Sequence, residues 1–113
     1  MIENKSLQFA IDIVNLCKLL QNDRQEYTMS KQLLRAGTSI GANVAESQQA
    51  QSKADFVSKL SIALKESAET RYWLKLLNAT GYISDREYSA LSLNCAELER
   101  ILTSIIKTCK SDD

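Results

Sequence analysis

Three glutamates are the side chains of this 113-residue chain that come closest to a cation site. Glu66 and Glu69 lie three residues apart, which places both carboxylates on one face of a helix, and Glu46 is a third candidate ligand. Carboxylate oxygens are the ligands that hard cations prefer. The alternative is that these carboxylates are solvated or paired with cations of the chain, of which the nearest candidates are Lys65, Arg71 and Arg35. The sequence favours this alternative, and we predict no metal site.

The residue types also give little indication of acid–base catalysis, a zinc site, a phosphate-binding loop or a reactive thiol. The chain has no histidine, the commonest general base and a frequent zinc ligand. The segment GTSIG at 37–41 lacks the Lys-Ser/Thr pair that completes a phosphate-binding loop. Cys17, Cys95 and Cys109 are widely spaced and each falls on an apolar helical stripe, so we expect buried thiols in a reducing cytoplasm. We predict that the protein is not an enzyme and uses no cofactor.

The basic residues raise the question of nucleic acid, since Lys and Arg neutralise phosphates. Lys+Arg and Asp+Glu both total 14, and this zero net charge argues against a protein that coats DNA. Residues 28–81 nevertheless carry seven basic and four acidic residues. The candidate phosphate contacts are Lys31, Arg35, Lys53, Arg71 and Lys75. Tyr72 and Trp73 are neighbouring aromatics that could stack on bases, although a solvated charged face is the stronger interpretation of these residues alone.

The elements that must position these residues are helices. The chain has no proline and three glycines, too few turn residues for a sheet protein. Apolar residues recur at helical spacing in four segments, which predict helices over about 7–21, 29–49, 53–79 and 85–109. The predicted N-terminal caps are Thr28 or Ser30, Ser52 with Asp55, and Ser84 with Glu87. We predict one all-α domain over residues 1–113, an antiparallel up-down four-helix bundle.

Small and polar residues mark the second and third predicted helices. Gly37, Gly41 and Ala45 lie four residues apart, and glycine costs a helix roughly 1 kcal/mol relative to alanine. Close approach of a neighbouring helix is the favoured reason, with a flexible or strained segment as the alternative. Three polar residues fall at core positions: Asn43, Ser67 and Thr70. A polar group there costs energy unless it is hydrogen-bonded, so we interpret these residues as fixing the register of the helices.

More of the helix surface is apolar than one copy of the chain can cover. The first helix carries two apolar stripes, one beginning at Leu7 and the other at Phe9, and only a narrow line between them is polar. In the third helix, Ile62, Trp73 and Leu76 point nearly opposite to its apolar seam. We therefore predict a homo-oligomer with these three residues in its interface.

Polar residues interrupt the apolar N-terminal stretch at Asp12, Asn15 and Lys18. Neither a signal peptide nor a membrane span tolerates that pattern well. We therefore expect a cytoplasmic protein without membrane contact.

Three motifs carry a resemblance to a known family. They are S-I-G-A-N-V-A-E at 39–46, K-x-D-F at 53–56, and A-L-K-E-S-x-E-T-x-Y-W-L at 63–74. The sequence resembles the bacterial four-helix bundle proteins encoded in intervening sequences of 23S rRNA genes, some of which carry a ribosomal-protein-like name. The resemblance runs from about Phe9 to Lys107.

The resemblance implies a fold of four antiparallel helices and a ring-shaped homopentamer. A related branch, the accessory protein of diversity-generating retroelements, binds nucleic acid and a reverse transcriptase, and it is strongly basic where this chain is neutral. By resemblance, the signature positions are Ser39, Asn43, Glu46, Lys65, Glu66, Glu69, Tyr72 and Trp73. We expect them to build helix contacts and subunit interfaces.

Taken together, the residues and the resemblance predict a non-enzymatic oligomer that acts as an accessory protein associated with RNA or another nucleic acid. The expected partners are further copies of the chain, RNA or DNA, and a reverse transcriptase or ribosomal component. The alternative is a protein-interaction or scaffold module without nucleic-acid contact.

Overall fold

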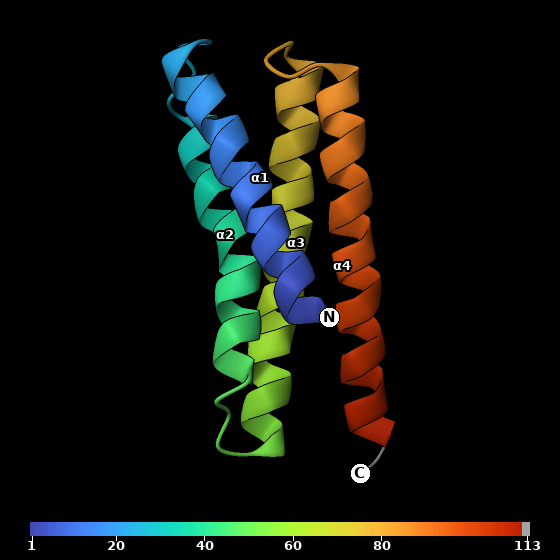
Figure 1. Ribbon diagram of the computed structural model, residues 1–113. Helices are drawn as coiled ribbons and strands as arrows, with labels where there is room; N and C mark the ends of the chain where they lie inside the picture. The colour runs from blue at the N-terminus through green and yellow to red at the C-terminus, as the bar shows by residue number, and fades with distance from the viewer. Residues whose placement is uncertain (112–113) are drawn as a thin grey trace.

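The apolar segments form four helices in the computed structural model, which describes residues 1–111 (Figure 1). The helices are α1 (Ile2–Asn22), α2 (Met29–Ser47), α3 (Lys53–Ala79) and α4 (Asp85–Ser111). Each helix packs against the next along the chain, and α1 also packs against α4. The result is an antiparallel bundle of 48 × 21 × 20 Å, which confirms the predicted fold class. In Figure 1, α1 runs at an angle across the front of the bundle, from α2 at the top towards α4.

Three of the four helices differ from their predicted bounds. The first helix begins at Ile2, not at residue 7, because Ile2 and Ser6 are buried and their burial extends the helix towards the N-terminus. The second ends at Ser47, not at residue 49, before a short turn that leads to Ser52. The fourth continues to Ser111, while α3 has the predicted bounds.

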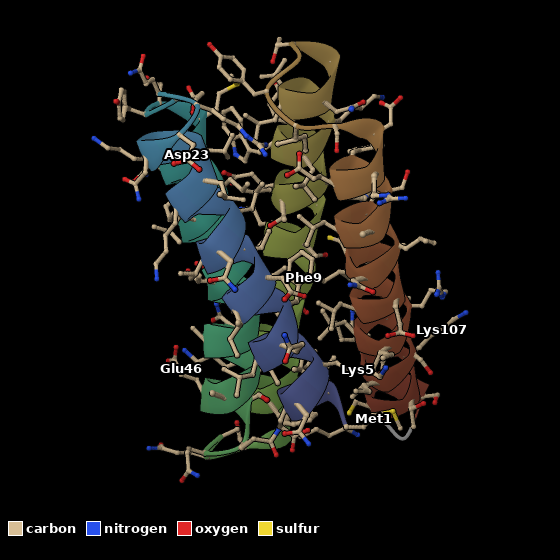
Figure 2. All side chains as sticks on the ribbon, turned by 45° about the horizontal axis from the view of Figure 1, so that its top comes forward. Met1, Lys5, Phe9, Asp23, Glu46 and Lys107 are labelled. Carbon is tan, nitrogen blue, oxygen red and sulfur yellow. The ribbon has the colours of Figure 1, made fainter. Side chains whose placement is uncertain are left out.

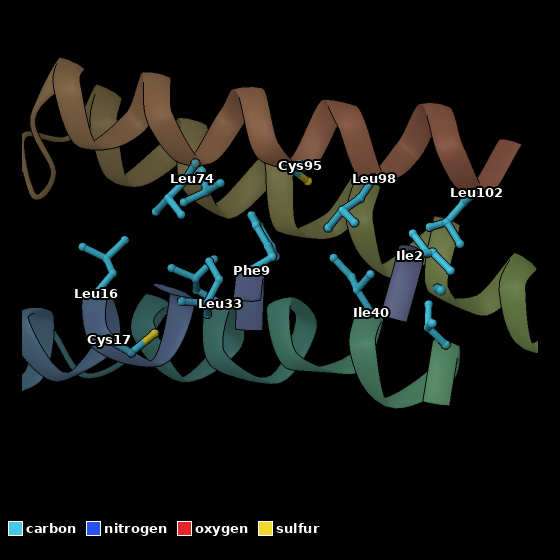
Figure 3. Packing of buried hydrophobic residues seen from close by; sticks show 14 of the residues in the cluster. Ile2, Phe9, Leu16, Cys17, Leu33, Ile40, Leu74, Cys95, Leu98 and Leu102 are labelled. Carbon is cyan, nitrogen blue, oxygen red and sulfur yellow. The ribbon is translucent and has the colours of Figure 1, made fainter. Parts of the chain in front are cut away.

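The core is built from the apolar seams that the sequence shows. On α2, Leu33, Ala36, Ile40 and Val44 are fully buried. On α4, Tyr88 and Ile105 are half-buried, and Ile106 takes the core position near the end of the helix. Figure 3 shows Phe9, Leu33, Leu74 and Leu98 converging in the space between the helices.

Gly37 and Gly41 lie where α1 approaches α2 most closely. A Cβ atom on Gly37 would lie 2.9 Å from Cγ2 of Ile13, and one on Gly41 would lie 3.2 Å from the backbone oxygen of Ser6. Ala45, the third member of this spacing, is exposed. The two glycines therefore let α1 rest against the backbone of α2.

The three polar residues at core positions bond within their own helices. Asn43 Nδ2 donates to the Ser39 oxygen at 2.8 Å, Ser67 Oγ to the Leu64 oxygen at 2.6 Å, and Thr70 Oγ1 to the Glu66 oxygen at 2.8 Å. These bonds satisfy the polar groups without reaching a neighbouring helix. The hydrogen bonds of these side chains therefore do not join neighbouring helices, and their role in fixing the register stays a prediction.

Two buried thiols do bond between helices. Cys17 Sγ donates to the Ser30 oxygen and Cys95 Sγ to the Ser67 oxygen, both at 3.4 Å. Burial raises the pKa of Cys17 to about 11, with a smaller contribution from Glu26, and raises the pKa of Cys95 to about 12. Both groups are therefore protonated at neutral pH and are poor nucleophiles. Cys109 is half-buried near the end of α4.

The cap of α2 differs from the prediction. Neither Thr28 nor Ser30 caps the helix; the buried carboxylate of Glu26 accepts the backbone N–H groups of Thr28, Met29 and Ser30 at 3.2, 3.1 and 2.7 Å. The residue before it, Gln25, has φ of 56°, a left-handed conformation that turns the chain back towards α2. Three of the amides left free at a helix start are thus satisfied by one side chain.

The other two predicted caps are present. Ser52 Oγ accepts from the Asp55 amide at 3.0 Å, although the Asp55 carboxylate reaches back to the amide of Gln51, not of Ser52. Ser84 and Glu87 form a reciprocal box, with bonds of 2.8 and 3.1 Å. Both helices therefore begin where the sequence predicted.

Ion pairs join both ends of α1 to α4. Lys5 bonds Glu97 at 2.8 Å, and Arg24, just after α1, forms two bonds with the Glu87 carboxylate at 3.0 and 2.9 Å. The hydrogen bond from Arg24 lowers the pKa of Glu87, and the bond from Lys5 lowers the pKa of Glu97. The capping carboxylate of α4 therefore also anchors the turn that follows α1.

Candidate functional site

The structure does not bring the five predicted phosphate contacts together. Lys31 and Arg35 lie on α2, whereas Arg71 and Lys75 lie on the side of α3 that faces α4. Lys53 occupies the first turn of α3, about 33 Å along that helix from Lys75. Of this set, only Arg71 and Lys75 share a site.

Arg35 joins α2 to α3 through ion pairs. Its guanidinium reaches from α2 to two carboxylates of α3, with Nη1 at 3.0 Å from Glu66 Oε2 and Nη2 bonded to Glu69. Trp73 Nε1 donates to the same Glu69 oxygen at 2.9 Å. Glu66 and Glu69 therefore serve as partners of Arg35, which is the alternative that the sequence favoured over a cation site.

The third candidate ligand also pairs with a cation, because Glu46 lies 3.4 Å from Lys59 Nζ. Over residues 1–111, the acidic and cysteine side chains form no cluster of three suited to a metal ion. The carboxylates of the signature motifs thus join α2 to α3.

The predicted interface stripe is partly covered within the chain itself. Ile62 is 40% exposed, while Trp73 and Leu76 are half-buried. Trp73 packs against the core and is tied to Glu69. An interface role for this stripe stays a prediction, and Leu7, on another surface, is more exposed than Ile62.

That surface is a groove between α1 and α2, which we call the α1–α2 groove. It has a volume of about 520 Å³ and a mainly apolar lining. Its apolar and small lining residues are Leu7, Ala10, Gly41, Ala42 and Ala45. Leu7 is 59% exposed, so this part of the first apolar stripe has no cover within the described chain. Small residues leave room for another helix to approach closely.

A second exposed surface lies on α4. Leu93 is 70% exposed. It belongs to a row at steps of seven residues that also contains Arg86, Arg100 and Lys107, so the four side chains share one side of the helix. We call this set the α4 stripe. Figure 2 shows Glu46 on α2 and Lys107 on α4 at opposite sides of the bundle. Leu93 was not predicted from the sequence, although it stands in a row of basic residues at steps of seven residues.

A third feature is a pocket between α3 and α4, which we call the α3–α4 pocket. Its volume is about 290 Å³, and its polar lining residues are Arg71, Tyr72, Lys75, Tyr88 and Ser92. Arg71 Nε donates to Glu99, which raises the pKa of Arg71 and keeps the guanidinium charged. The pocket therefore combines two cations with two phenol rings.

Comparison with known proteins identifies the family. Residues 1–104 match the family model described as 23S rRNA-intervening sequence protein. The chain belongs to this family. It is similar to the crystal structure of a protein with unknown function from the S23 ribosomal protein family of Bacteroides thetaiotaomicron VPI-5482. The two are 54% identical with a TM-score of 0.94, over 95% of this chain and 99% of that one. A search among curated proteins finds no match.

The match confirms the resemblance to the 23S rRNA-intervening sequence proteins, and it begins at residue 1, before Phe9, and ends at residue 104, before Lys107. Neither description names a retroelement accessory protein, so that branch remains part of the resemblance alone. Within this family member, the motif at 63–74 supplies the carboxylates that hold Arg35 and the phenol of Tyr72 in the α3–α4 pocket, while Arg71 occupies one of its unspecified positions. None of the helices in residues 1–111 is long and apolar enough to span a bilayer.

Proposed function

We propose that this protein is a non-enzymatic, self-associating bundle that acts as an accessory protein associated with RNA or DNA. The observation that carries the self-association is a pair of uncovered surfaces, the α1–α2 groove and the α4 stripe. Leu7 and Leu93 are 59% and 70% exposed at their centres, and covering both removes apolar surface from water.

The two surfaces are complementary in shape and charge. The groove is lined by small residues and would accept the ridge that Leu93 forms on α4. Glu3 lines the groove and Glu46 follows Ala42 by one turn, while the stripe carries Arg100 and Lys107. Because the groove lies on α1 and α2 and the stripe lies on α4, the contact joins two different surfaces, so it is head-to-tail and repeats from copy to copy. Such contacts close into rings when the rotation between copies permits it. The family resemblance implies five copies.

The first test of this proposal is the mass of the protein in solution. We expect light scattering to give a multiple of 12.7 kDa for the natural sequence and a monomer for Leu93→Asp, because a charge would be buried in the groove. Tyr27→Asp is the matched control, since Tyr27 is 54% exposed and lies outside both surfaces. It is expected to leave the mass unchanged. A monomeric natural protein at high concentration would contradict self-association.

A mixing experiment tests the head-to-tail geometry. Leu7→Asp damages only the groove and Leu93→Asp only the stripe, so each variant keeps one intact surface. We expect each variant alone to be monomeric and an equimolar mixture to form a heterodimer. If the mixture stays monomeric while the natural protein assembles, groove and stripe do not face each other across the interface.

The nucleic-acid part of the proposal is supported by the family description, which refers to 23S rRNA, and by assembly, because several weak basic sites on linked copies act together. We expect binding of structured RNA at low micromolar protein that weakens steeply as salt rises. Zero net charge and the pairing of Arg35 with two carboxylates support the alternative, a scaffold without nucleic-acid contact. Absence of binding at low salt, or binding that salt does not weaken, would favour that alternative.

A further inference from the structure

We propose that the α3–α4 pocket binds one nucleotide of a single-stranded nucleic acid, with its phosphate on Arg71 and Lys75 and its base on Tyr72. The inference rests on the nucleic-acid part of the proposed function and names the site and the ligand form. At about 290 Å³, the pocket is at the small end of ligand sites and suits one nucleotide, not a duplex.

Arg71 is held in place for a phosphate. Its Nε is bonded to Glu99 of α4, and within the described chain its two Nη groups have no hydrogen-bond partner. A guanidinium fixed through Nε presents both Nη groups as a fork that matches two phosphate oxygens. Lys75 lies one turn further along α3, is exposed and lines the same pocket, so it adds a second positive charge. Ser92 adds a hydroxyl from α4.

Tyr72 is placed to stack on a base. It is 57% exposed, an uncommon position for an aromatic ring, and it contacts Trp73 edge to face with ring centroids 5.0 Å apart and planes at 75°. Trp73 is itself held by Glu69, so the Tyr72 ring rests on a fixed neighbour. A ring held in this way loses little freedom when a base covers its open face.

This arrangement discriminates between nucleic-acid forms. Bases inside a duplex are already stacked on one another, whereas unpaired bases can turn outwards onto an aromatic side chain. The pocket is therefore expected to bind single strands in preference to duplexes. Lys65, two turns before Tyr72 on the exposed surface of α3, would lie beside the backbone of the bound strand.

The experiment measures binding of a labelled single-stranded RNA decamer to the full chain by fluorescence anisotropy over a salt series. Tyr72→Ala is expected to weaken binding about 10-fold, the order found for loss of one stacked base. Arg71→Ala with Lys75→Ala is expected to reduce the slope of log affinity against log salt by about 1.4, the value for two phosphate contacts. Lys75→Ala alone, at an exposed site, should reduce it by about 0.7 and keeps the test valid if the double variant unfolds.

The control is Lys18→Ala with Lys110→Ala, which removes two exposed charges outside the α3–α4 pocket. If the slope of log affinity against log salt falls by the same amount in this control, the α3–α4 pocket is not the binding site. Competition with uridine monophosphate, inorganic phosphate, an RNA duplex and a phosphopeptide identifies the ligand, and equal competition by the duplex or the phosphopeptide would also overturn it. If the natural protein binds RNA in a salt-dependent way and the pocket variants bind as well, the pocket is wrong and the proposed function stands. If the natural protein binds no RNA, the nucleic-acid function fails and the pocket fails with it.

Discussion

Replacing Gly37 with valine is expected to lower the free energy of unfolding by about 3 kcal/mol, the upper range for an overpacked core. A Cβ atom at this position would lie 2.9 Å from Cγ2 and 3.3 Å from Cβ of Ile13. Ile13 is fully buried and branched next to its backbone, so its side chain cannot swing away. The added atoms must therefore push α1 off α2, which also disturbs the groove that these helices form. Urea denaturation at a fixed protein concentration measures the effect.

Two further variants separate steric clash from helix propensity. Lys31→Val puts the same side chain on an exposed position of α2 and is expected to change stability by no more than about 0.5 kcal/mol. Ile13→Ala makes room beside Gly37. The double variant with Gly37→Val should therefore lose less free energy of unfolding than the two single variants together, by at least about 1 kcal/mol. Additive single effects would show that the contact in the structure does not govern the loss.

Replacing Glu26 with alanine is expected to lower the free energy of unfolding by about 2 kcal/mol, because three backbone amides at the start of α2 lose their hydrogen-bond acceptor. These amides bond the Glu26 carboxylate at 2.7 to 3.2 Å, and Glu26 is 7% exposed. Loss of an ordinary cap costs about 1 kcal/mol, and loss of a charged acceptor from buried donors costs more. Urea denaturation gives the free energy, and hydrogen exchange should show reduced protection of the Ser30 amide.

Two controls identify Glu26 as the cap. Thr28→Ala is expected to leave stability nearly unchanged, since the Thr28 side chain makes no capping bond. Glu26→Gln keeps one acceptor oxygen and loses the charge, so it should fall between the natural protein and Glu26→Ala. A larger loss for Thr28→Ala than for Glu26→Ala would contradict the cap seen in the structure.

Much of the fold follows from short-range patterns. Apolar residues at steps of three and four, and caps such as Ser84 with Glu87, involve residues within one or two turns of each other. The number, order and approximate bounds of the helices could therefore be predicted. The cap of α2 could not, because Glu26 reaches the helix through a turn that depends on the left-handed conformation of Gln25.

The candidate sites were harder to predict, since they depend on pairs of residues far apart in the sequence. Arg35 was a plausible phosphate contact by type and spacing, yet α2 presents it to Glu66 and Glu69 of α3. Arg71 and Lys75 are four residues apart, about one helical turn, and both line the α3–α4 pocket. The partners of that site on α4, Tyr88 and Ser92, come from a separate helix and had no local signal.

The sequence by itself determined that this protein is made of four amphipathic helices, which residues form most of its core, and that its first helix carries more apolar surface than a core requires. These properties follow from the order of residue types along each helix. Only the tertiary structure decided which apolar residues stay uncovered, such as Leu7 and Leu93, and which charged groups form ion pairs. The reason is that the rotation of each helix about its own axis is set by packing against two neighbours at once, and no single helix contains that information.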